Sequence, residues 1–214
     1  MLTFSAFISI ACGIIVVGFL SASAFYAREV DGISTTRNLI KRAGLIAAIW
    51  AIAEAFTIVS NLAAIIDSSF FEALDSTSLR SYITQTSLGK VQFYSLIGAL
   101  LVSSFSQLIK KTGGIVAILL LALASLVLPL FQSHGSQSGL HGLAIGAIVF
   151  HVAALAFWIG GVVSLFFLPN REEAIPRFSV VALWCAGIVG ASGDRKSTRL
   201  NSSHSSVSRM PSSA

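Results

Sequence analysis

The chain has few charged residues. Asp, Glu, Lys and Arg together make up 11% of its 214 residues, whereas hydrophobic residues make up 55%. Such a composition has too little polar surface to cover a soluble globule of this length, which excludes an ordinary water-soluble domain. The sequence therefore indicates a membrane protein.

Sulfur-containing residues are also scarce. The two methionines, Met1 and Met210, cannot form the thioether cluster that monovalent copper often prefers. The two cysteines, Cys12 and Cys185, fall in separate hydrophobic segments, which favours isolated buried thiols over a disulfide or a metal site. Any metal chemistry must therefore depend mainly on histidine.

Catalytic signatures are absent from the sequence. It contains no CxxC pair, no HExxH helix, no phosphate-binding glycine loop and no GxSxG elbow. Ser and His residues within lipid, without an exposed acid, do not indicate a hydrolase. We therefore expect that the protein is not an enzyme.

Long hydrophobic runs are what the sequence does contain. Crossing a hydrocarbon core of ~30 Å takes roughly 17 to 25 apolar residues in a helix. The runs predict an all-α, polytopic transmembrane helix bundle of about six spans, with the last one truncated. The expected spans are Phe7–Tyr26, Ala43–Ile66, Val91–Ile109, Ile115–Phe131, Leu143–Leu168 and Phe178 to about Ser192.

The distribution of Lys and Arg among the loops predicts the orientation. These residues concentrate in the first, third and fifth loops, which we place in the cytoplasm, with the N-terminus outside. The second loop, Asp67–Lys90, is then external and long enough for a short amphipathic helix on the membrane surface. The basic residues of the odd loops are Arg28, Arg37, Lys41, Arg42, Lys110, Lys111, Arg171 and Arg177.

Polar residues recur within the second span. Trp50, Glu54, Thr57 and Asn61 follow one another at intervals of four, three and four, so they share one helical face that should point into the bundle. Glu54 lies roughly 16 Å from the cytoplasmic end of its span. An ionised carboxylate there is costly. Two readings stay open: a neutral acid that hydrogen-bonds another helix, or an ion relay.

Three of the four histidines lie between Ser133 and Gly161. We expect His134 and His141 in an external Gly/Ser-rich loop and His151 within the membrane. Imidazole is a ligand for copper, zinc and haem iron, and the loop glycines could let these side chains converge. The pattern predicts metal binding by at least two of the three. The alternative for His151 is a neutral imidazole bonded to a Ser or a carbonyl.

The last residues differ from the rest of the chain. The segment DRKSTRLNSSHSSVSRMPSSA from Asp194 is basic, serine-rich and without apolar periodicity, which predicts disorder. It resembles the peptide produced when sequencing-adapter DNA is translated as if it were coding. We therefore expect residues 194–214 to be a non-native tail and exclude His204 from any site. The tail also supplies much of the basic charge, so the charge does not indicate nucleic-acid binding.

The sequence LHGLAIGAIVFHVAALAFWIGG resembles the copper resistance protein D (CopD) family, with His151 seven residues before the Trp-Ile-Gly-Gly element at Trp158. The following RFSVVALWCAGIVGASG is similar to the family's next helix. The resemblance covers 133–193 well and the first four spans, in 1–132, only by hydropathy. It implies a copper-transporting or copper-resistance protein of the bacterial cytoplasmic (inner) membrane, often beside an extracytoplasmic CopC-type partner. In some relatives a CtaG-type cytochrome oxidase assembly domain follows.

On this interpretation His134 and His141 are external capture ligands for copper, His151 is the entry ligand within the membrane and Glu54 is an ion relay. Two other functions stay open. A haem-binding, cytochrome-like protein would use His151 as an axial ligand, although no second histidine at matched depth on another helix is found. A non-catalytic assembly subunit linked to cytochrome oxidase biogenesis would use its histidines only structurally.

Overall fold

The computed structural model describes residues 4–109, 111–131 and 141–207, and within them the regular structure is helical. This confirms the predicted all-α class. The described residues form seven α-helices and two 3₁₀ turns, in this order: α1 (Phe4–Phe25), α2 (Ala27–Ile65), η1 (Glu72–Leu74), α3 (Ser76–Gln85), α4 (Ser87–Ser106), α5 (Thr112–Val127), η2 (Leu128–Phe131), α6 (His141–Leu165) and α7 (Arg171–Val207).

Each of the six predicted spans coincides with one of these helices. Five helical segments are long and apolar enough to cross a membrane: Phe4–Phe25, Glu29–Ile65, Ser87–Ser106, Ile148–Leu165 and Arg171–Gly190. The remaining one, α5, has 16 residues, and η2 extends it to Phe131. The structure therefore has the expected helical membrane bundle. The loop expected to hold an external helix contains η1 and α3.

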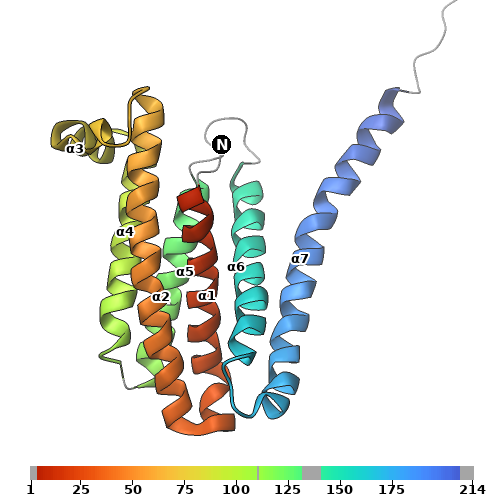
Figure 1. The fold of residues 1–214 in the computed structure, drawn as a ribbon. Coiled ribbons are helices and arrows are strands. Elements are labelled where there is room, and N and C mark those ends of the chain that lie inside the picture. The colour runs from red at the N-terminus through yellow and green to blue at the C-terminus, as the bar shows by residue number, and fades with distance from the viewer. Residues whose placement is uncertain (1–3, 110, 132–140, 208–214) are drawn as a thin grey trace, which may run out of the picture.

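The bundle is organised around α1, which packs against α2, α5 and α6 (Figure 1). Helix α4 packs on α2 and α5, and the first half of α7 lies along α6. Helix α3 runs crosswise at one end of α2 and α4 (Figure 1). The core where α1, α2 and α5 meet includes Val16, Val17, Leu20, Ala43, Ala47, Trp50, Ala122 and Leu126. Polar residues that belong to this core are therefore shielded from lipid.

Helices α1 and α6 run in the same direction (Figure 1). They approach each other closely at Gly18 and Gly160. A Cβ atom added to Gly18 would lie 2.1 Å from the backbone of Gly160, and one added to Gly160 would lie 2.4 Å from the carbonyl oxygen of Ile14. Further along both helices, the hydroxyls of Tyr26 and Ser164 form a hydrogen bond of 2.8 Å. The small residues permit close packing in lipid, and together these contacts fix the register of α1 against α6.

Helix α2 begins earlier than hydropathy predicts. The segment expected as the first loop, residues 27–42, is helical apart from a kink at Gly32, whose φ of 80° suits glycine. Beside the kink, Asp31 accepts a hydrogen bond of 3.1 Å from the backbone N–H of Asn170. The polar start of α2 is thereby attached to the turn between α6 and α7.

Helix α7 continues through residues 194–207, where the composition predicts disorder, and is inclined away from α6 along its length (Figure 1). Residues 208–214 lie outside the described part of the chain. For the tail, the structure differs from the prediction only in the backbone conformation of residues 194–207, which are helical. The non-native origin of the tail stays a prediction, as do the expected boundaries between the regions 1–132, 133–193 and 194–214.

Candidate functional site

Glu54 is buried in the centre of the bundle, where its side chain is 5% exposed. Trp50 and Thr57 on the same face of α2 are 1% and 6% exposed, and Asn61 is half-buried. The prediction that this polar face points into the bundle is therefore confirmed for the three residues nearest the centre. These side chains point toward other helices because four-residue and three-residue steps return to the same side of a helix.

A hydrogen bond links the Glu54 carboxyl group of α2 to α1, and another joins α4 to α5. From α1, the Ser9 hydroxyl donates to Glu54 Oε2 and accepts a bond of 3.1 Å from the Trp50 indole N–H. On α4, the buried Ser95 hydroxyl donates to the carbonyl oxygen of Ser125 on α5 at 3.0 Å. A buried polar group normally needs such a partner, and the Ser9 hydroxyl supplies one to the Glu54 carboxyl group.

The network has no cation beside it in the described part of the chain. The one ion pair found there joins Arg177 and Glu29 at 3.4 Å, at the basic end of the bundle. Helix α1 presents the Ser9 hydroxyl to Glu54. The arrangement can hold a proton on Glu54, or offer oxygen atoms to a small cation.

His151 lies on α6, on the other side of α1 from α2, and its side chain is partly exposed. Its depth follows from the glycine contact, because His151 precedes Gly160 by nine residues and Ser9 precedes Gly18 by nine residues. Since α1 and α6 run in the same direction with the same rise per residue, His151 and Ser9 lie at about the same level. The intramembrane histidine is therefore level with the Glu54 network, one helix away from it.

His141 is the first residue of α6, so the expectation that it belongs to the loop is wrong. The helix begins two residues before Leu143, where hydropathy placed its start. His141 and His151 are ten residues apart on one helix, which separates them by about 15 Å along its axis. They therefore occupy successive levels of the bundle rather than neighbouring positions around one ion. The side chain of His141 is not among those described.

The structure does not bring the three predicted ligands together. His134 lies outside the described residues, and no group of three or more His, Cys, Asp or Glu side chains within the described part could hold a metal ion. The thiols of Cys12 and Cys185 are both free, as predicted. The three-histidine metal site stays a prediction.

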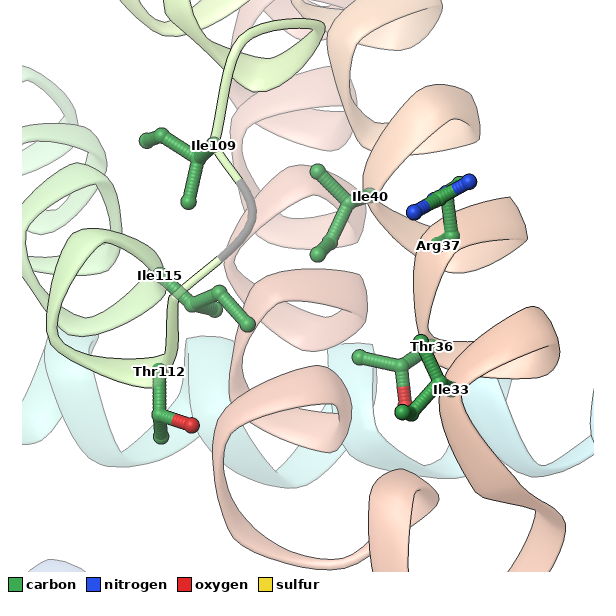
Figure 2. A pocket seen from close by; sticks show the side chains of 7 residues that line it. All are labelled: Ile33, Thr36, Arg37, Ile40, Ile109, Thr112 and Ile115. Atoms are coloured by element: carbon green, nitrogen blue, oxygen red, sulfur yellow. The ribbon is translucent and has the colours of Figure 1, made fainter.

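A separate pocket of about 60 Å³ opens at the basic end, between α2 and the connection from α4 to α5 (Figure 2). Ile40 lines it from α2, opposite Ile109 and Ile115. Its polar residues are Thr36, Arg37 and Thr112. None of the residues that line this pocket is a usual copper ligand, so it is not a candidate metal site.

Sequence reasoning identified Glu54 and missed Ser9, which donates a hydrogen bond to it, and the buried Ser95 of α4. Ser9 follows Ser5 by four residues in the first span, a spacing that places both on one helical face and could have indicated a polar contact. Ser95 is one of several serines in α4 and has no comparable signal, because its partner Ser125 is set by how α4 packs on α5.

Comparison with known proteins gives one match. No curated protein and no solved structure matches the chain. The profile of the copper resistance protein D-like N-terminal domain matches residues 1–143. The match covers the four spans that resembled the family only by hydropathy, and it overlaps the motif-bearing segment from Ser133 only as far as residue 143. It includes the whole Glu54 network, and because it spans more than half of the sequence, the chain belongs to the copper resistance protein D-like family.

Proposed function

We propose that this protein transports copper across the bacterial cytoplasmic membrane. Copper is the cargo, captured on the outer face by His134 and His141 and passed to His151 within the membrane. Glu54 acts as an ion relay beside this route. The observation that carries the proposal is the common depth of His151 and the Glu54 network, within a bundle whose family is named for copper resistance.

The two levels of histidine on α6 support a stepwise route. A copper ion bound near His141 would move about 15 Å along the helix to reach His151. A neutral imidazole suits copper at both levels. Among the described residues no second histidine shares the level of His151, so no observation favours a haem with two histidine ligands. The proposal includes no catalytic step.

The proposed orientation places the N-terminus and α3 outside. The described Lys and Arg residues near the opposite end of the bundle support it: Arg37, Lys41, Arg42, Lys111, Arg171 and Arg177. An extracytoplasmic CopC-type protein would then deliver copper to the face that carries His134.

Replacement of His151 by Ala tests the route. The variant loses a nitrogen ligand at a depth where water cannot readily replace it, so we expect copper accumulation to fall to the level of cells without the protein. The measurement is cellular copper in a copper-sensitive host, with the amount of protein in the membrane determined in parallel.

Phe150→Ala provides the matched control. Phe150 precedes His151 on α6 and is 64% exposed, so its loss alters the same helix at the same depth without removing a ligand. We expect Phe150→Ala to accumulate copper like the unaltered protein. A His151→Ala protein present at normal levels that also accumulates copper normally would show that His151 is structural.

A further inference from the structure

The hydrogen-bond partners around the Glu54 carboxyl group bear on its protonation. A serine hydroxyl has one hydrogen to donate. The Ser9 hydroxyl accepts from the Trp50 indole N–H and donates to Glu54 Oε2. The Ser95 hydroxyl of α4 uses its hydrogen on the carbonyl oxygen of Ser125. Among the described residues, no Lys, Arg or His side chain forms an ion pair with Glu54.

A neutral Glu54 fits these surroundings. Its side chain is 5% exposed, it accepts a hydrogen bond from the uncharged Ser9 hydroxyl, and no cation is paired with it among the described residues. The cost of an ionised carboxylate inside a bilayer also favours the neutral acid.

Polar groups continue from Glu54 toward one end of the bundle. One turn further along α2, the Thr57 hydroxyl donates to the carbonyl of Ala53 at 2.8 Å, and its oxygen lies 3.1 Å from the Ser5 hydroxyl of α1. Ser5 and Ser60 in turn line an open groove, together with Phe4, Phe56, Phe70 and Phe71. Ser60 is six residues from Glu54, about 9 Å along the helix. Hydroxyl groups thus lead from the groove almost to the carboxyl group.

Toward the basic end the interface between α1 and α2 is closed. The Trp50 indole packs against Gly13, where an added Cβ would lie 3.3 Å from the ring and 2.8 Å from Leu126. Beyond Trp50 the core is apolar and includes Ala43, Ala47, Val17 and Leu20. Cys12 adds a free thiol on α1. Polar access to Glu54 therefore comes from the end of the bundle that carries α3.

We propose that Glu54 is an exchangeable proton-binding site, loaded from the groove beside α3 through Thr57 and Ser5. The proposal narrows the relay role suggested above to a proton, but it rests on the geometry of the bundle and its test needs no copper. Failure of copper transport and failure of proton binding are therefore separate results.

Infrared spectroscopy of the purified protein in lipid tests the proposal. At neutral pH we expect a carbonyl band of a protonated carboxylic acid that is lost in Glu54→Gln. After transfer to D₂O, the shift of this band reports exchange of the Glu54 proton. Thr57→Val keeps the shape of the side chain and removes its hydroxyl, so exchange should slow about tenfold, as expected for the loss of one hydrogen-bonded step.

Thr36→Val is the matched control, because Thr36 is a buried threonine of α2 that donates to the carbonyl of Gly32 at 3.0 Å at the opposite end. It should leave the exchange rate unchanged. Equal slowing by Thr36→Val, or no slowing by Thr57→Val, would overturn the route.

A second measurement uses the unaltered protein, so its result does not depend on whether the variants fold. A hydrophobic carbodiimide adds across a protonated carboxyl group, taking up the acid proton and forming a stable acylurea. Mass spectrometry should locate this adduct on Glu54 at neutral pH. A protein with neither the adduct nor the acid band carries an ionised Glu54, which would overturn the proposal.

Discussion

At the scale of single residues, burial alone does not explain what Glu54 does. Its carboxyl group accepts a hydrogen bond from Ser9, and the Ser9 hydroxyl in turn accepts one from Trp50. Hydrogen bonds between transmembrane helices have a modest average value, but removing one partner leaves the other buried without compensation. Ser9 serves two partners at once, so its loss affects both α2 side chains.

We predict that Ser9→Ala lowers the stability of the bundle by about 1 to 2 kcal/mol, because the Trp50 N–H loses its acceptor and Glu54 loses a donor. Ser21→Ala is the matched control, since Ser21 is equally buried on α1 but donates to a carbonyl of its own helix, that of Gly18, at 2.8 Å. Thermal unfolding in detergent should show a lower midpoint for Ser9→Ala alone. Equal shifts of the unfolding midpoint in both variants would mean that the hydrogen bonds of Ser9 to Trp50 and Glu54 do not stabilise the bundle.

The sequence predicted the Glu54 site in part. The spacing of Trp50, Glu54 and Thr57 follows from helix geometry alone and could be predicted. The partner Ser9 depends on how α1 packs against α2, which no local pattern encodes. His134 and His141 stay predictions, because the structure does not describe their side chains.

At the scale of elements, the segment between α2 and α4 is held by its own side chains. The Asp75 carboxylate accepts a hydrogen bond of 2.9 Å from the backbone N–H of Ser78 at the start of α3, and this bond holds the pKa of Asp75 below its ordinary value. The backbone N–H of Ser69 donates to Glu72 at 2.9 Å and lowers the pKa of Glu72 likewise. Both carboxylates are fully exposed to solvent, so the segment should respond to pH.

Because the pKa of each carboxyl is lower in the folded segment, its stabilising contribution is complete above the unfolded pKa of about 4 and is lost as the pH falls through the folded pKa. We predict that the Ser69 and Ser78 amides lose protection from hydrogen exchange as the pH is lowered from about 6 to about 3, after correction for intrinsic rates.

The Gly89 amide supplies an internal control. It donates at 2.9 Å to the neutral Thr86 hydroxyl at the start of α4, a cap that does not titrate in this range. Protection of Gly89 should therefore stay constant. A parallel loss at all three amides would indicate general unfolding and contradict the role of the carboxylates.

At the scale of the whole molecule, hydropathy predicted the spans well and the connection before α2 poorly. A span is set by the thickness of the hydrocarbon core, which composition reflects directly. Residues 27–42 are polar enough to be expected as a loop, yet they form the start of α2. A helix satisfies its own backbone in water as well as in lipid, so it can extend past the membrane where side chains such as Arg37 and Lys41 are solvated.

The bundle places its two ends in different electrostatic surroundings, and this asymmetry makes the orientation testable. Most of the described Lys and Arg residues lie near the end that carries the start of α2, whereas Asp67, Glu72 and Asp75 lie near α3. Positively charged segments stay in the cytoplasm during membrane insertion. We predict that α3 lies outside and the start of α2 lies inside.

Two exposed positions on opposite ends allow a paired labelling test, in a variant in which Cys12 and Cys185 are replaced by Ala. Thr77 is exposed on α3, and Ser34 is exposed just after the kink in α2. A membrane-impermeant maleimide should label Thr77→Cys in intact spheroplasts, because α3 is then in contact with the medium. Ser34→Cys should react only after the membrane is permeabilised. The opposite pattern would place the groove beside α3 in the cytoplasm, so that Glu54 would exchange its proton with the inside of the cell.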